Sequence, residues 1–134
     1  MKIDGACHCG AITYEAEIDP AGVRLCHCTG CQTLSGSAFR VTVAAAEGSF
    51  ALLSGHPIIY IKTADSGAKR AHAFCGDCGT PIYATAAGAG PKRYGLRVGT
   101  IRQRAELRPH RQYWFHSALR WVVDLQHLET FDKQ

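Results

Sequence analysis

Long apolar runs are missing from this 134-residue sequence, and so is a high density of charge. The longest uninterrupted apolar stretch, as in Val43–Ala46, is far shorter than the roughly 20 residues that cross a bilayer, so we expect no membrane partner. The N-terminal segment has no apolar stretch of signal-peptide length, which favours a cytoplasmic protein. Charged residues make up 19% and hydrophobic residues 46%, a balance that excludes an intrinsically disordered chain.

Internal repeats of solenoid length and long amphipathic helical stripes are also absent. A chain of this length is typical of one domain, and the segment 84–92 has the composition of a loop, with too little chain after it for a second core. We therefore expect residues 1–134 to form a single domain.

Apolar residues alternate with polar ones instead, which is typical of half-buried strands. In 11–18, Ile12, Tyr14, Ala16 and Ile18 share one face. Two short helical turns are expected, at 28–34 and 110–116, and Trp114 and Trp121 are expected in the core. The pattern predicts a mainly β protein, with further strands at 39–43, 57–62, 70–75, 81–85, 94–99 and 118–124.

The seven cysteines form three clusters: Cys7-His8-Cys9, Cys26-His27-Cys28 with Cys31, and Cys75-Gly76-Asp77-Cys78. An odd number of cysteines in a reducing compartment argues against a disulfide framework and for thiolate ligands or a reactive thiol. In a C-x-C pair on extended chain both sulfurs point the same way, and a C-x-x-C turn can do the same when Gly76 and Gly79 give it freedom. Zinc fits this spacing best, ahead of an iron–sulfur cluster or inert buried thiols.

Seven thiols can be divided into a closed set of four and an open set of three. Three of them, at positions 26, 28 and 31, lie within six residues, whereas the other two clusters are pairs that each need a second pair. The economical partition is a structural zinc on Cys7, Cys9, Cys75 and Cys78 and a working zinc on Cys26, Cys28 and Cys31 with a free position. A closed site completed by a histidine remains an alternative, with His27, His72, His110 and His116 as candidates.

The basic residues gather in the second half of the chain. Residues 69–134 hold eleven Lys and Arg against five Asp and Glu, whereas residues 1–68 hold four against six. This surplus predicts either attraction of an anionic ligand or an ordinary solvated basic face. Aromatic residues in the same half could stack bases, but nucleic acid is the less favoured partner. Candidates for the rim of a substrate site are His27, Arg40, Lys62, Arg70 and His72.

Longer motifs around the cysteines resemble the family of glutathione-dependent formaldehyde-activating enzymes and centromere protein V domains. The resemblance covers nearly the whole chain. It implies an Mss4-like fold of several coiled antiparallel β-sheets with short helical turns, stabilised by zinc, and the same division of the cysteines into a structural and a working zinc site. The motifs that carry it are GACHCGAITYEAE at 5–17, CHCTGCQTLSGSAF at 26–39, FCGDCGTPIY at 74–83, VGTI at 98–101, YWFHSALRW at 113–121 and LETFDKQ at 128–134.

The resemblance further implies a carbon–sulfur lyase that condenses glutathione with formaldehyde to S-(hydroxymethyl)glutathione, with Cys26, Cys28 and Cys31 as the catalytic residues. Its partner would be a small anionic thiol. The chain has His72 where many members carry arginine, and Ile101-Arg102 where the pattern usually continues Leu-Asp. The alternative is a non-catalytic zinc-binding module or a glutathione carrier, which the fourth position of the second metal site would distinguish.

Overall fold

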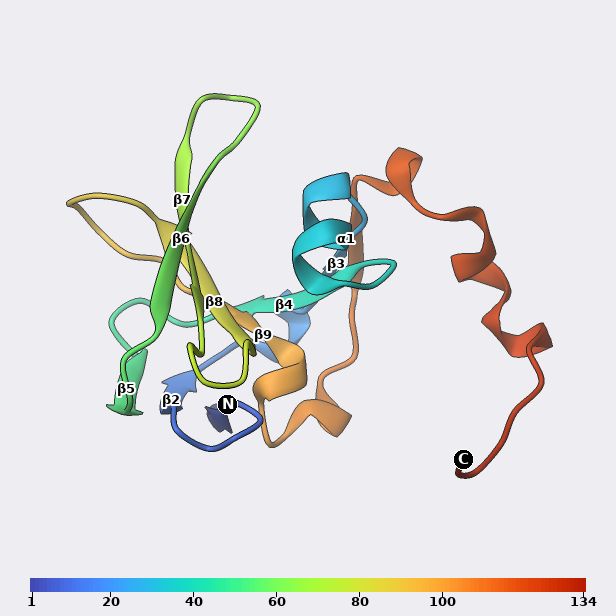
Figure 1. Ribbon diagram of the computed structural model, residues 1–134, viewed down its shortest axis with the longest axis horizontal. Helices are drawn as coiled ribbons and strands as arrows, with labels where there is room; N and C mark the ends of the chain where they lie inside the picture. Colours follow the sequence, from blue (N-terminus) through green and yellow to red (C-terminus); the bar gives the residue numbers. More distant parts are fainter.

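Ten strands in two sheets make up most of the regular structure of the protein, which a computed structural model describes over residues 1–134 (Figure 1). The smaller sheet is antiparallel and has the order β1-β2-β5, with β1 at Lys2–Ala6, β2 at Thr13–Glu17 and β5 at Ala51–Ser54. The chain is therefore mainly β, as its alternating pattern predicted.

The larger sheet has seven strands in the order β10-β3-β4-β9-β8-β7-β6. Only the pair β10 and β3 is parallel, and all other neighbours are antiparallel. Its strands are β3 at Arg24–Cys26, β4 at Arg40–Ala44, β6 at Ile58–Thr63, β7 at Lys69–Phe74, β8 at Pro81–Ala86, β9 at Gly95–Arg97 and β10 at Arg111–Tyr113.

Helical structure is confined to short segments. The single α-helix, α1, spans Thr29–Ser35 and ends at Gly36, whose φ of 65° suits the left-handed cap that glycine adopts at low cost. No helix is long and apolar enough to cross a membrane. The 3-10 turns are η1 at Pro20–Gly22, η2 at Val98–Thr100, η3 at Arg104–Glu106, η4 at Phe115–Ser117 and η5 at Arg120–His127.

The core lies between the two sheets and follows the predicted alternation. In β2, Tyr14 and Ala16 are buried while Glu15 and Glu17 are exposed. Seventeen buried residues form one hydrophobic cluster that draws on both sheets. Burying about 25 cal/mol per Å² of apolar surface makes this cluster the main source of stability apart from the cysteine sites.

The C-terminal segment differs from the prediction. Residues 118–124 do not form a strand, because they have no neighbouring strand to pair with, and Trp114 and Trp121 are 52% and 55% exposed instead of lying in the core. The segment 110–116 is not a helical turn throughout, since β10 occupies its centre. Beyond Ser117 the chain runs away from the two sheets (red in Figure 1).

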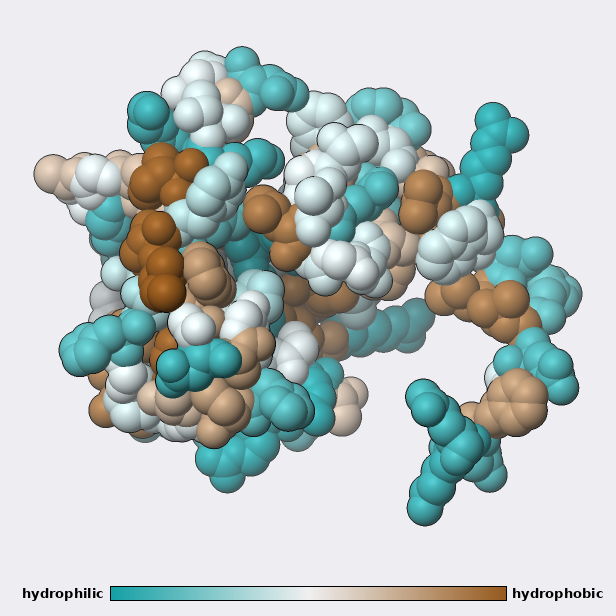
Figure 2. All heavy atoms as spheres, in the orientation of Figure 1, coloured by the Kyte–Doolittle hydropathy of each residue, from teal (hydrophilic) through white to brown (hydrophobic).

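Strand β6 forms the outer edge of the large sheet and is apolar on both faces. Its residues Ile58, Ile59, Tyr60 and Ile61 are all about half exposed, and the isoleucines among them account for the dark brown patch over β6 in Figure 2. Three strands, β1, β3 and β5, show no sustained alternation of apolar and polar residues that the sequence could reveal, and they are added by pairing with neighbours.

Candidate metal centres and the pocket beside them

The structure brings Cys7, Cys9, Cys75 and Cys78 together, with all four Sγ atoms within 4.8 Å of one another. Cys7 Sγ lies 3.5 Å from Cys9 Sγ, and Cys9 Sγ lies 3.8 Å from Cys75 Sγ. A tetrahedral zinc with Zn–S bonds near 2.3 Å sets sulfurs about 3.8 Å apart, so the four thiols already have the spacing of a closed metal site.

Two similar turns supply these four thiols, and each ends on a glycine. Gly10 N donates to Cys7 O and Gly79 N donates to Cys75 O, and both glycines have positive φ, at 82° and 75°. The spacing of Cys7 and Cys9 predicted a pair on extended chain. The structure places the pair in a turn instead. Gly76 is needed for a different reason than backbone freedom, since a Cβ there would lie 2.7 Å from Ile58 Cδ1.

Backbone and hydroxyl donors already point at this cluster. Ile12 N donates to Cys7 Sγ at 3.2 Å, a contact expected of a thiolate ligand. Thr80 Oγ1 lies 3.1 Å from Cys78 Sγ and accepts from His8 N at 3.1 Å, so Thr80 ties the two turns to each other. The Thr80 hydroxyl is the main reason why the pKa of Cys78 falls to about 5.

Cys26, Cys28 and Cys31 form the second cluster, also within 4.8 Å of one another. Cys26 ends β3, Cys28 caps α1, and Cys31 lies in the first turn of α1, where its N–H donates to Cys28 Sγ at 3.3 Å. Burial raises the pKa of Cys31 to about 12. The pKa of Cys28 is lowered in spite of its burial, because the Cys31 N–H and neighbouring thiols donate to it. Both clusters could therefore hold a metal ion.

No histidine or carboxylate completes the second cluster, because only the three sulfurs come together there. His27 is fully buried between Phe39 and Phe115, and its Nε2 is 2.8 Å from Gln112 Oε1. The closed alternative with a histidine ligand therefore finds no support in the arrangement of His27, His72, His110 or His116.

A pocket of about 410 Å³ opens beside the three-cysteine cluster. It has five cationic side chains and no Asp or Glu. Strand pairing explains how it forms, since Tyr113 of β10 lies opposite Cys26 of β3 and Arg24 stacks 5.8 Å from the Tyr113 ring. Its lining is Arg24, Cys26, Cys31, Arg40, Thr42, Lys62, Arg70, His72, Ala84, Arg97, Tyr113 and Trp114.

Two of these cations are buried without a carboxylate partner. Arg40 is 7% exposed and Arg97 is 9% exposed, and neither takes part in an ion pair. Burial, followed by the neighbouring charge of Arg40, lowers the pKa of Arg97 to about 9. Burying a guanidinium is costly, so these two cations favour negative charge close by, either on the thiol of Cys31, whose charge acts on Arg97, or on an anion in the pocket.

Four of the five predicted rim residues line the pocket, namely Arg40, Lys62, Arg70 and His72, whereas His27 is packed away from it. Lys62 Nζ reaches the three-cysteine cluster by lying directly over Gly30. A Cβ on Gly30 would come within 2.5 Å of this nitrogen. Sequence reasoning missed Arg24, Arg97, Tyr113 and Trp114. Arg97 belongs to the basic surplus of the second half of the chain and lies inside the predicted strand 94–99, but nothing in the sequence pairs that strand with β4.

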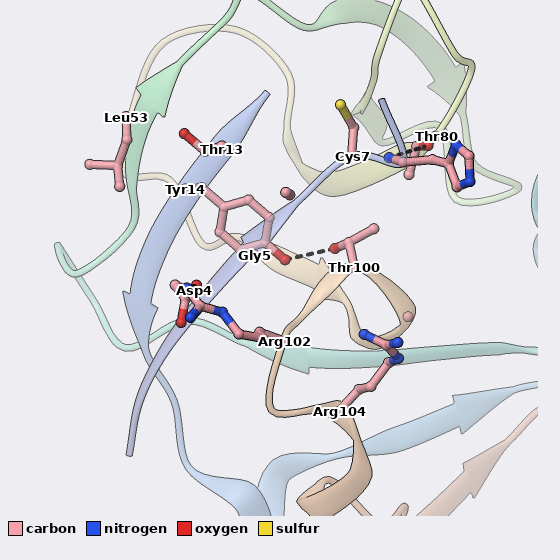
Figure 3. Close-up of a pocket in the computed structure, with 13 residues that line it drawn as sticks. Asp4, Gly5, Cys7, Thr13, Tyr14, Leu53, Thr80, Thr100, Arg102 and Arg104 are labelled. Carbon is pink, nitrogen blue, oxygen red and sulfur yellow. Dashed lines mark hydrogen bonds and ion pairs between the residues drawn. The ribbon is translucent and has the colours of Figure 1, made fainter. Parts of the chain in front are cut away.

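The largest hollow lies elsewhere, between β1, β2 and the turns η2 and η3, and measures about 650 Å³ (Figure 3). Most of its charged and polar groups already have partners within the protein. Tyr14 OH lies 2.7 Å from Thr100 Oγ1, and Asp4 pairs with Arg102 and with Gln103. Gln103 first, and then Arg102, hold the pKa of Asp4 below its usual value. Apart from the exposed imidazole of His8, the hollow offers few unpartnered groups to a ligand, so the candidate site is the pocket at the three-cysteine cluster.

Fold and site together define a β-rich protein with two cysteine clusters, each able to hold a metal ion. The model of the family described as glutathione-dependent formaldehyde-activating enzyme matches residues 2–117, and the chain belongs to this family. A search of curated proteins found no match. A crystal structure of a Rhodobacter sphaeroides protein is similar, with 22% sequence identity, a TM-score of 0.61, and coverage of 81% of this chain and 98% of that chain. At this identity the likeness shows the fold alone.

Proposed function

We propose that the protein is a zinc-dependent enzyme of the carbon–sulfur lyase type, which joins a small anionic thiol to formaldehyde. The thiol is glutathione and the product is S-(hydroxymethyl)glutathione. Cys7, Cys9, Cys75 and Cys78 hold a structural zinc. The working zinc is held by the other cluster, Cys26, Cys28 and Cys31. A reducing cytoplasm would keep all seven thiols available for these roles.

One observation carries the proposal: the three-cysteine cluster has no fourth protein ligand and opens onto a pocket with five cations and no carboxylate. A zinc site with three protein ligands and a free position is typical of catalytic sites. When bound there, zinc would lower the pKa of a thiol that occupies the free position. Family membership is the independent support for this choice of chemistry.

The charges of the pocket match a thiolate substrate. Zinc with three thiolates carries a net charge of −1, and a further thiolate makes it −2, so cations must lie nearby to stabilise it. Arg40, Arg97 and Lys62 surround the cluster and meet this need. The remaining cations of the lining, Arg24 and Arg70, have no carboxylate partner and would bind the carboxylates of glutathione.

The experiment compares adduct formation from glutathione and ¹³C-formaldehyde, followed by NMR magnetisation transfer, with and without the zinc-loaded protein. We expect the protein to raise the rate above the uncatalysed reaction and Cys31→Ser to abolish that increase. Arg108→Gln, an exposed arginine outside the pocket, serves as the control and should match the parent. Binding of glutathione with no increase in rate would instead identify a carrier, and the absence of both would contradict the proposal.

A further inference from the structure

His72 presents a hydrogen-bond donor of fixed position to the pocket. It lies in β7, and its Nδ1 is 3.3 Å from an Nη atom of Arg97. A guanidinium can only donate, so Nδ1 must accept, and the ring proton of a neutral His72 is therefore on Nε2. Nε2 has no hydrogen-bond partner in the protein and is not among the buried unpartnered atoms, so it is accessible from the hollows that His72 lines, namely the cationic pocket and an adjoining hollow of about 310 Å³ that Arg40 and Arg97 also line.

The strand register explains how Arg97 reaches His72 from two strands away. His72 pairs with Ala84 of β8, and Ala84 pairs with Gly95 of β9. These two positions carry the smallest side chains, and Arg97 lies two residues beyond Gly95 on the same face of the sheet. The guanidinium of Arg97 can therefore extend across Ala84 and Gly95 to the imidazole, which makes Arg97 the residue that positions His72.

The surroundings keep His72 neutral. The charged groups that face it are Arg97 from β9, Arg40 from β4, Lys62 from β6 and Arg70 from its own strand, and no carboxylate is among them. The titratable thiols of Cys26 and Cys31 line the same pocket. Burial first, and then these four cations, lower the pKa of His72 to about 4. A neutral imidazole held in one tautomer is suited to polarising a carbonyl group and unsuited to exchanging protons near pH 7.

We propose that His72 is a catalytic residue that binds the carbonyl oxygen of the aldehyde through Nε2–H, a role that rests on the proposed function. The thiolate forms the new carbon–sulfur bond, the π electrons of the carbonyl move onto oxygen, and the Nε2–H hydrogen bond stabilises the alkoxide. The proton that the thiol released ends on that oxygen by way of water. His72 keeps its own proton throughout, so the step balances without any oxidant or reductant.

The first test reads the tautomer directly from ¹⁵N-histidine spectra of the zinc-loaded protein, with the His72 signals identified by their loss in His72→Gln. We expect a protonated Nε2 and an unprotonated Nδ1 at pH 7. Arg97→Met removes the donor to Nδ1 and should give a mixture of tautomers. An Nδ1–H tautomer or an imidazolium in the parent at pH 7 would overturn the assignment, whether or not the protein acts on formaldehyde.

The second test separates hydrogen bonding from packing. His72→Leu should lower kcat by about 100-fold with little change in the KM for glutathione, as expected when one donor to an oxyanion is removed. His72→Gln keeps an N–H donor and should recover part of the rate, and His56→Leu, an exposed histidine outside the pocket, should match the parent. Equal rates for His72→Leu and the parent would refute the role. An inactive parent with the expected tautomer would refute the proposed function, and the oxygen-binding role with it, while leaving the Arg97–His72 arrangement established.

Discussion

The four-cysteine cluster joins turns that lie 66 residues apart at Cys9 and Cys75, whereas the three-cysteine cluster comes from six consecutive residues. The first cluster connects the end of β1 in the small sheet with the β7–β8 turn of the large sheet. A metal there closes a long loop and crosslinks the two sheets, whereas a metal on the second cluster fixes only one strand end and the first turn of α1. The difference predicts that one cluster supports the fold and the other is free for exchange with ligands.

The surroundings of the two clusters differ in the same direction. In the first cluster Cys7 and Cys75 are buried and Cys9 and Cys78 are exposed, and four thiols are held there together with the donors Ile12 N and Thr80 Oγ1. All three cysteines of the second cluster are partly exposed, and two of them line the cationic pocket. Closed coordination by protein groups suits a structural site, and partial exposure beside unpaired cations suits a binding site.

Among the changes that test this comparison, Cys75→Ser should have the largest effect on the protein. Because the free energy of binding a structural zinc is largely folding free energy, on the order of 10 kcal/mol, we expect the variant to lose its cooperative thermal transition and most of its metal. Thermal unfolding and elemental analysis measure both. An unchanged melting curve with full metal content would show that the first cluster does not support the fold.

Cys28→Ser is the matched change in the second cluster. Since Cys28 makes no contact between distant parts of the chain, the variant should stay folded, retain about one zinc and bind glutathione about 100-fold more weakly than the parent. Calorimetric titration with glutathione and elemental analysis test this expectation. Equal affinity in variant and parent would place the thiol site elsewhere.

Arg97→Met separates the function of the pocket from its stability. A buried guanidinium beside Arg40 destabilises the folded chain, and an apolar side chain of similar length should raise the free energy of unfolding by about 1 kcal/mol. The same change should weaken glutathione binding roughly 30-fold, because a buried charge that meets an anion is lost. Chemical denaturation and calorimetry give the two numbers, with Arg108→Gln as the control. A loss of both stability and affinity would mean that Arg97 is a structural residue.

Much of this comparison was predictable from the sequence, and the reason is local chemistry. The spacing of the cysteines and the alternation in β2, β4, β7 and β8 depend on neighbouring residues, so the grouping of the thiols and the β-rich class could be inferred. The zinc ion predicted for each group rests on the same spacing and is tested by the variants above.

The remainder depends on contacts between distant strands. Trp114 and Trp121 carry apolar side chains but find no neighbouring element, and β10 exists only because β3 lies beside it. The pocket is assembled from all seven strands of the large sheet, so no local signal could place Arg97 against His72. The pairing of strands across the sheet decides these positions, and the order of strands in a sheet cannot be inferred from the local pattern of a single sequence.

The smallest expected effect concerns pH and the neutral state of His72. The histidine pKa is about 6.5 in an unfolded chain and falls to about 4 in the folded protein. Between these values the unfolded chain binds a proton that the folded chain does not, so the contribution of His72 to stability is present above pH 6.5 and is lost as the pH falls towards 4. The difference in unfolding free energy between the parent and His72→Gln should therefore be constant above neutral pH and should move against the parent below about pH 6.5. Urea denaturation of both proteins across this range measures it. A difference that moves in favour of the parent as the pH falls would show that folded His72 is protonated. The pocket would then no longer combine fixed cations with a neutral donor, and this contrast with the first cluster, which holds only thiols, would be lost.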